Sequence, residues 1–171
     1  MNGGNEQMPV EVFVELCREG AVIPSYAKPG DSGMDVHAAE DILIRPGCTV
    51  VIPTGLKLAL PEGYEIQVRP RSGISLGTPL RISNSPGTID SGYRDELGII
   101  MTNASQACGH EGEILTIDSK GNKPGIYRVR RGDRIAQIVL QAVPRMKLTV
   151  VESVKEMGSD RGGGFGSTGV R

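Results

Sequence analysis

Residues 49–70 read TVVIPTGLKLALPEGYEIQVRP, and this stretch decides the expected fold class. Two β-like runs, at 49–60 and 64–70, are rich in branched apolar side chains and are separated by the turn-forming residues LPEG. Branched side chains favour strands, whereas proline and glycine interrupt them. The stretch therefore predicts short β-strands that are joined by tight turns.

Similar runs lie on both sides of this stretch. They cover residues 10–16, 21–24, 34–38, 42–44, 80–83, 97–103, 113–118, 125–130, 134–143 and 147–154. No window keeps a long helical period, although residues 74–77 and 152–157 could each form one helical turn. Many short strands separated by turn signals predict an all-β domain, built as a sandwich, barrel or jelly roll. Residues 104–125 are expected to project from it as a long hairpin.

Composition limits the classes of function. The chain has 171 residues, which suits one domain, and 38% of them are hydrophobic but only 4% aromatic, so the core must consist mainly of valine, isoleucine and leucine. A net charge of −1 and a pI of about 6.1 argue against a protein that binds the nucleic-acid backbone. A small anionic ligand held by a few local arginines remains compatible with this balance.

The cysteines and the hydrophobic runs bear on the cellular setting. The three cysteines are Cys17, Cys48 and Cys108, an odd number without a C-x-x-C pair, which disfavours a disulfide framework. The first residues lack the pattern of a signal peptide, and no run approaches the roughly 18–20 apolar residues of a membrane span. We expect a cytoplasmic protein with no direct nucleic-acid or membrane partner.

The segment GTIDSGYRDEL, residues 87–97, combines a carboxylate, a tyrosine and further charges. One interpretation is a polar hairpin whose charges are simply solvated. The other is that Asp90 acts as a general base on a water molecule, because a hairpin between strands can hold a carboxylate within hydrogen-bond reach. Spacing alone leaves both interpretations open.

The segment VRPRSGISLG, residues 68–77, could hold an anion. Arg71 can make paired bonds to phosphate oxygens, and Ser72 and the backbone N–H groups of a helical turn would add donors. A plain N-cap with surface arginines is the alternative.

The segment GDRIAQIVL, residues 132–140, interrupts an apolar strand with Arg134 and Gln137. On a regular strand these two side chains lie on opposite faces, so one of them is expected to point inward. A buried glutamine needs hydrogen-bond partners, and a phosphate would be one. The alternative is a hairpin turn followed by an ordinary alternating strand.

The acidic segment DSGMDVHAAED and the last residues could also belong to a site. The acidic segment, residues 31–41, could hold Mg²⁺ directly or through water, although its spacing does not match an EF-hand loop.

Residues 159–171 read SDRGGGFGSTGVR, a composition that favours a disordered end. Yet arginine, hydroxyls and glycine amides suit phosphates, and a phenyl ring can stack on a base. A flexible arm that closes over a nucleotide would use these parts and would expel water.

Five segments, in order, resemble the motifs of the trimeric dUTP pyrophosphatases (dUTPases). They are Ser32–Val36, Pro70–Gly73, Asn84 with Gly87–Glu96, Gly132–Gln137 and Arg161–Gly169. One glycine-rich motif would be weak, but five in the right order on an all-β background are highly specific. The resemblance covers most of the chain. One departure is Asp95, which stands where the family usually has a glycine.

The resemblance implies a jelly-roll-like β-barrel of the dUTPase-like β-clip type, assembled as a homotrimer with sites at subunit interfaces. It implies hydrolysis of dUTP to dUMP and pyrophosphate with Mg²⁺, a reaction that limits uracil in DNA and supplies dUMP for dTTP synthesis. It also divides the chain into a barrel domain, residues 1–158, with residues 104–125 as a hairpin insertion, and a flexible glycine-rich arm, residues 159–171, that closes the site of neighbouring subunits.

The resemblance also implies roles for single residues. Asp90 deprotonates the attacking water, Tyr93 packs against the deoxyribose, and Asp35 supports the metal through water. The other implied substrate-binding residues are Arg71, Ser72, Gly73 and Gln137 around the phosphates, Asn84, Gly87 and Ile89 around the uracil, and Arg161, Phe165, Gly166, Ser167 and Thr168 in the arm.

Two other functions stay open at the level of sequence. A related deaminase of the same fold would act on dCTP and release ammonia. A nucleotide-responsive binding protein would use the 104–125 hairpin to contact a partner.

Overall fold

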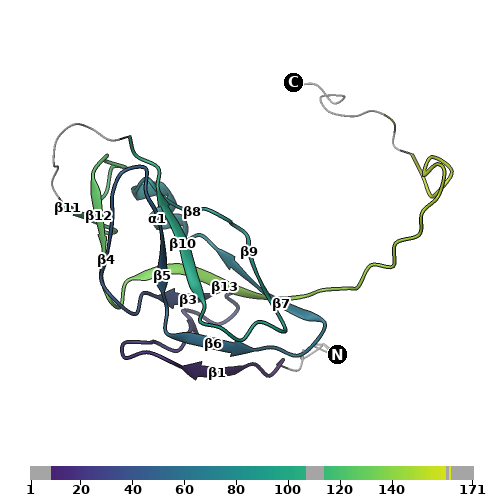
Figure 1. Cartoon of the computed structure of the whole chain (residues 1–171), viewed down its shortest axis with the longest axis horizontal. Helices are drawn as coiled ribbons and strands as arrows, with labels where there is room; N and C mark the ends of the chain where they lie inside the picture. The colour runs from purple at the N-terminus through teal and green to yellow at the C-terminus, as the bar shows by residue number, and fades with distance from the viewer. Residues whose placement is uncertain (1–8, 107–113, 161, 163–171) are drawn as a thin grey trace, which may run out of the picture.

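The computed structural model describes residues 9–106, 114–160 and 162 (Figure 1). These residues form thirteen strands and one short helix. The strands are β1 (Phe13–Leu16), β2 (Ser25–Tyr26), β3 (Met34–His37), β4 (Ile42–Ile44), β5 (Thr49–Pro53), β6 (Leu56–Ala59), β7 (Tyr64–Arg69), β8 (Leu80–Ile82), β9 (Gly87–Asp90), β10 (Gly98–Asn103), β11 (Ile114–Thr116), β12 (Ile126–Val129) and β13 (Arg134–Ala142). The helix is α1 (Ser72–Gly77). In the described ranges, no helix is long and apolar enough to cross a membrane.

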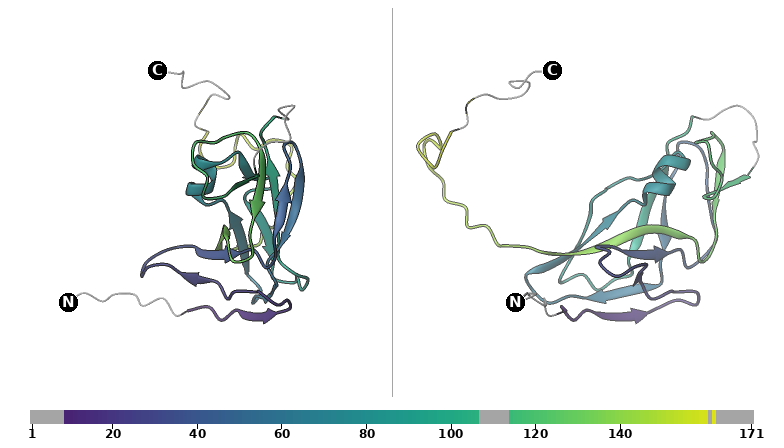
Figure 2. Two further views of the ribbon diagram at one scale, coloured as in Figure 1. Left: turned by 90° about the vertical axis from the view of Figure 1, so that its left-hand side faces the viewer. Right: turned by 180° about the vertical axis from the view of Figure 1, so that it is seen from behind.

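The strands form four sheets that lie around a common core. The largest has the order β2-β3-β13-β7-β9, and the others have the orders β5-β10-β8, β11-β12-β4 and β1-β6. Different views show the sheets facing one another in a jelly-roll-like arrangement (Figure 2). The all-β prediction is therefore confirmed, although the described strands stay in separate sheets and do not close into one barrel.

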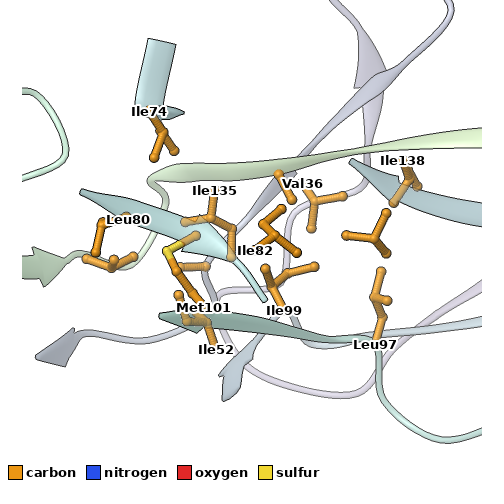
Figure 3. Close-up of a cluster of buried hydrophobic side chains, with 14 of the residues drawn as sticks. Val36, Ile52, Ile74, Leu80, Ile82, Leu97, Ile99, Met101, Ile135 and Ile138 are labelled. Atoms are coloured by element: carbon orange, nitrogen blue, oxygen red, sulfur yellow. The ribbon is translucent and has the colours of Figure 1, made fainter. Parts of the chain in front are cut away.

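The core is made mainly of aliphatic side chains from all of these layers. Figure 3 shows the part of it that comes from β3, β5, β8, β10, β13 and α1. Val36, Ile52 and Ile99 are fully buried, as expected for a chain with few aromatic residues. Ile74 of α1 also joins the core, so that a single apolar anchor fixes the short helix against the sheets. Because α1 begins at Ser72, the burial of Ile74 also fixes the position of residues Arg71–Gly73.

A β-bulge near the start of β13 overturns one sequence expectation. The register with β3 shifts between Arg134 and Ala136, so that Arg134 pairs with His37 and Gln137 pairs with Asp35. A bulge adds one residue to a strand and changes which side chains share a face. Arg134 and Gln137 were expected on opposite faces, but both side chains contact Asp35.

Four of the expected secondary-structure segments differ from the structure. The run 49–60 is divided into β5 and β6, and no strand covers 21–24 or 147–154. Residues 152–157 form no helix; instead, the Met157 N–H donates to the Val154 carbonyl in a turn. Beyond β13 the described chain extends away from the body (Figure 1), so a strand at 147–154 has no pairing partner among the described residues.

The expected hairpin at 104–125 is only partly described, so it stays a prediction. β11 runs parallel to β12, with Ile114 opposite Ile126, so these strands do not form an antiparallel pair. The base of the segment is held by Asn103, whose Nδ2 donates to the carbonyls of Ile44 at 3.0 Å and Gly125 at 2.8 Å. Residues 107–113 lie outside the described ranges. The division of the whole chain into a barrel and an arm remains a proposal.

Candidate active site

The buried carboxylate of Asp35 collects three polar side chains, and we call Asp35, Arg71, Arg134 and Gln137 the Asp35 cluster. Oδ1 accepts a hydrogen bond from Arg71 Nε at 2.9 Å and from Gln137 Nε2 at 3.3 Å. Oδ2 accepts from Arg134 Nη1 at 3.2 Å. Two guanidinium groups against one carboxylate leave a local surplus of positive charge. This surplus suits an anion.

Three different elements position the cluster. β3 carries Asp35, β13 carries Gln137 directly opposite it, and the turn between β7 and α1 carries Arg71. Arg71 is also the N-cap residue of α1, and its side chain makes no capping bond to the helix. The alternative interpretation, in which this segment is a plain N-cap formed by Ser72, is therefore wrong. Ser72 and Gly73 are exposed in the first turn, where their backbone N–H groups precede the helical hydrogen bonds.

Opposing effects act on the pKa of Asp35. Burial acts to raise it, but the charge and hydrogen bond of Arg71, the bond from Gln137 and the charge of Arg134 together hold the pKa below its ordinary value. A carboxylate with a lowered pKa stabilises the folded chain above its unfolded pKa of about 3.9. This stabilisation is lost as the pH falls through the lower pKa of the folded state.

We expect Asp35→Asn to lower the free energy of unfolding by about 1–3 kcal/mol at pH 7, because the ion pairs with two arginines are lost. The loss should shrink below about pH 4, where the carboxyl of the unfolded wild-type chain becomes protonated, and should vanish as the pH falls through the lower pKa of the folded state. Denaturant unfolding of both proteins between pH 3 and 7, in buffer with a chelator, measures this. Asp118→Asn is the control, since Asp118 also pairs with an arginine but has a 77% exposed side chain. An equal loss at every pH would contradict the expectation.

The second group of candidate residues follows β9. Asp90 ends that strand with an exposed side chain, and its carbonyl accepts the Tyr93 N–H at 3.0 Å. The Tyr93 hydroxyl donates to the Glu96 carbonyl at 3.0 Å. The turn thus fixes the Tyr93 backbone and the tip of its ring relative to Asp90.

The entry to this hairpin is tightly packed at Gly87. A Cβ atom there would lie 3.2 Å from Asn84 Nδ2 and 3.3 Å from Val68 Cβ, so a side chain would displace Asn84. Ile89 packs against the core, which leaves its backbone rather than its side chain for a ligand. Asp95 has no positive φ, so the turn does not need the glycine that the family pattern has there.

The two groups do not meet within one chain. Asp90 pairs with Glu65 on one side of β7, whereas Gln137 pairs with Arg69 on its other side. Along the sheet, Asp90 and Gln137 are offset by four residues, which is about 13 Å at about 3.3 Å per residue. Across the sheet, they are two strands apart, which is about 10 Å at about 4.8 Å per strand. The two groups of candidate residues therefore lie far apart within a single chain.

The possible metal ligands in the described chain fit a Mg²⁺ ion that is bound mainly by other groups. Both oxygens of Asp35 already accept hydrogen bonds, and the described residues contain no group of three or more histidine, cysteine, aspartate or glutamate side chains around a common point. Mg²⁺ commonly keeps several waters and binds one or two carboxylates together with substrate phosphates. The chain fits a metal that arrives with a polyphosphate and reaches Asp35 through water.

Some predicted residues lie outside the described ranges, and one functional candidate was missed. The predicted residues outside the described ranges are Arg161, Phe165, Gly166, Ser167 and Thr168.

The functional candidate that was missed from the sequence is Arg134, which pairs with Asp35. Arg134 was considered only for its place in the strand pattern. Its signal was the pattern R-I-A-Q, in which two apolar residues stand between two polar ones. That pattern is compatible with a bulge that buries both apolar residues.

An all-β chain that gathers guanidinium, amide and backbone donors beside a buried carboxylate belongs to the class of proteins suited to bind polyphosphates. The family profile described as dUTPase matches residues 19–108. A deoxyuridine 5′-triphosphate nucleotidohydrolase of Picosynechococcus sp. is 43% identical over 88% of this chain and 92% of its own length. One from Clostridium tetani is 40% identical over 91% of this chain and 94% of its own length. The chain belongs to the dUTPase family.

Solved structures agree with this relationship. The dUTPase of Staphylococcus bacteriophage 80alpha with dUpNHpp is 34% identical, has a TM-score of 0.84 and matches 94% of this chain and 99% of its own. A mutant dUTPase from phage phi11 of S. aureus, described with a structural Mg(II) ion, is 31% identical, with a TM-score of 0.74 over 84% of this chain and 97% of its own.

Proposed function

We propose that this protein is a dUTP diphosphatase that hydrolyses dUTP to dUMP and pyrophosphate. The observation that carries the proposal is that relatives named deoxyuridine 5′-triphosphate nucleotidohydrolase match most of the chain. The Asp35 cluster supplies the anion-binding chemistry that such a reaction needs, and Asp90 supplies an exposed carboxylate on a fixed turn. By this reaction the protein would limit uracil in DNA and supply dUMP for dTTP synthesis.

In this proposal Asp90 orients one water molecule and takes its proton. The water oxygen forms a bond to the α-phosphorus, and the bond from that phosphorus to the oxygen bridging to the β-phosphate breaks. Pyrophosphate leaves with the bridging oxygen, and dUMP keeps the new one. The carboxylate needs only to lie within hydrogen-bond reach of that water. The exposed side chain at the end of β9 would be accessible to such a water.

The phosphates would be held by Arg71, Gln137 and the first turn of α1 with Ser72 and Gly73. Their donors would stabilise the charge that builds up as pyrophosphate leaves. Mg²⁺ bound to the triphosphate would neutralise part of the phosphate charge, and Asp35 would hold the ion through water. The phi11 relative is described with a structural Mg(II) ion, which supports only the ability of a similar protein to bind this ion.

Specificity for dUTP would come from the β9 hairpin. The Tyr93 ring would pack against the deoxyribose and leave no room for a 2′-hydroxyl. Asn84 and the backbone at Gly87 and Ile89 would bind the uracil edge, and the close packing of Asn84 against Gly87 would help to fix the Asn84 amide. Polar groups that lose their partners reject a wrong base strongly.

We also infer that the active unit is a homotrimer whose sites combine residues of different chains. The separation of Asp90 from Gln137 in one chain supports this, because both would have to reach one triphosphate. The extended segment after β13 supports it too: Leu148 and Val150 are 85% and 99% exposed, although both are apolar. The apolar groove beside β1, lined by Val12, Val14, Ile23, Met34, Leu58 and Ile138, would accept such a segment from a second copy.

Within this assembly, the arm of residues 159–171 would close over the bound nucleotide. Phe165 would stack on the uracil, and Arg161, Gly166, Ser167 and Thr168 would engage the phosphates. A cytoplasmic setting is also part of the proposal, and the free thiols of Cys17 and Cys48 suit it.

Pyrophosphate release with Mg²⁺ from dUTP, dCTP, dTTP and UTP, with ammonia monitored in parallel, tests the proposal. We expect release from dUTP alone, because the uracil pocket excludes the thymine methyl and the Tyr93 ring excludes the ribose. Ammonia from dCTP would instead identify a deaminase. Tight dUTP binding without turnover of any nucleotide would identify a binding protein and would refute the proposed hydrolysis.

A further inference from the structure

An ion pair outside the two groups of site residues ties the exit of the β9 hairpin to a distant turn. Arg18, just after β1, donates from Nε to both carboxylate oxygens of Glu96, at 2.7 and 2.8 Å, across 78 residues of sequence. Its Nη1 also donates to Glu40 at 3.2 Å. Three segments of the chain therefore meet at this guanidinium.

The Glu96 carboxylate also holds the turn between β5 and β6. Its Oε1 accepts the Gly55 N–H at 2.8 Å, and the Gly55 carbonyl in turn accepts the Cys17 N–H at 2.8 Å. Gly55 has a φ of +72°, and a Cβ there would lie 2.6 Å from Ala21 Cβ, so only glycine fits between the two turns. The turn that carries Arg18 is thereby packed directly against the turn that binds Glu96.

The same short stretch carries the ring that the proposed function assigns to the sugar. The Tyr93 hydroxyl donates to the Glu96 carbonyl, and the next residue, Leu97, is fixed by its N–H to the Leu56 carbonyl at 2.8 Å and by Thr54 Oγ1, which donates to its carbonyl at 2.6 Å. The acceptor that fixes the tip of the Tyr93 ring is therefore itself fixed on both sides, by its own side chain and by Leu97.

An isolated ion pair on a protein surface contributes little. The Glu96 side chain is only 22% exposed and accepts a backbone N–H as well as the guanidinium, so its geometry is more restricted than that of a free surface pair. The hydrogen bond from the Tyr93 hydroxyl to the Glu96 carbonyl connects this restricted Glu96 directly to the candidate site.

We propose that Arg18 is a positioning residue for Tyr93: by holding Glu96, it fixes the phenol ring and so sets the discrimination between deoxyribonucleoside and ribonucleoside triphosphates. This inference rests on the proposed function, in which the Tyr93 ring excludes the 2′-hydroxyl. Arg18 need not touch the substrate. Its loss lets Glu96 and the ring move, and the space for a 2′-hydroxyl is no longer closed.

The test compares kcat/KM for dUTP and for UTP in Arg18→Gln and in the matched control Arg131→Gln. Arg131 lies on the same surface, is 52% exposed against 47% for Arg18, and pairs with Glu19 at 3.4 Å rather than with the hairpin. We expect the dUTP to UTP ratio to fall about tenfold in Arg18→Gln and to stay unchanged in Arg131→Gln. Glu96→Gln keeps an acceptor for Gly55 and should shift the ratio in the same direction, which provides a second variant if Arg18→Gln folds poorly.

Coupling to Tyr93 separates positioning from a general loss of stability. In a Tyr93→Phe background, which lacks the hydroxyl donor, Arg18→Gln should change the ratio far less than in the wild type, because both changes break the same connection. Additive effects, or a ratio unchanged in both Arg18→Gln and Glu96→Gln, would overturn the inference. Failure of the wild-type protein to hydrolyse dUTP would overturn the proposed function instead, so the two failures are distinguishable.

Discussion

Asp90→Asn is expected to lower kcat for dUTP by about 10²–10⁴-fold while the nucleotide still binds. Asparagine keeps the size of the side chain at the end of β9 but cannot take a proton from water. The exposed position means that the change leaves the core untouched. Single-turnover hydrolysis of dUTP measures the chemical step, and calorimetric titration with dUpNHpp measures binding. Asp95→Asn, in the same hairpin and also exposed, is the matched control.

Mixed assemblies sharpen this prediction. Arg71→Ala should also be nearly inactive, because it removes a phosphate donor from the Asp35 cluster. When Asp90→Asn and Arg71→Ala chains are unfolded together and refolded at equal amounts, about one quarter of the sites should combine an intact Asp90 with an intact Arg71 from another chain. Recovery of activity would support sites shared between subunits. Unchanged turnover in Asp90→Asn alone would exclude Asp90 as the base.

Ending the chain at Gly158 is expected to lower dUTP turnover by about 10²-fold or more while the fold persists. Every described strand ends before Val143, so the truncation removes no strand of the body. It does remove Arg161, Phe165, Ser167 and Thr168, the proposed closing groups. Steady-state hydrolysis, circular dichroism and sedimentation measure activity, fold and assembly in turn.

The full-length variant Phe165→Ala is the finer test of the arm, since it removes only the proposed stacking ring. We expect an intermediate loss of activity. An unfolded truncated chain would show that residues 159–171 stabilise the structure, and full activity in the truncated chain would remove the arm from the mechanism.

The sequence predicted most strands correctly because their signals are local. Runs such as 64–70 and 134–143 carry branched apolar residues between turn formers, and they became β7 and β13. Residues 147–154 carry the same signal but form no strand. A strand needs a partner as well as a propensity, and the described part of the chain places no partner beside this segment.

Non-local features could not be predicted in the same way. The bulge at Arg134 depends on pairing with β3, and the parallel pairing of β11 with β12 depends on which strand edge is free. The bond between Arg18 and Glu96 joins positions with no shared motif. Motif residues could be identified as a set, but their division between two distant groups follows from sheet register, which spacing in the sequence does not reveal.

The extended segment after β13 implies that the apparent stability of the fold depends on protein concentration. If Leu148 and Val150 find apolar contacts only on another copy, part of the free energy of folding is gained on association. Dilution would then favour the unfolded chain, and the midpoint of thermal unfolding would rise with protein concentration. For such a protein, a single stability value has meaning only together with the concentration at which it applies.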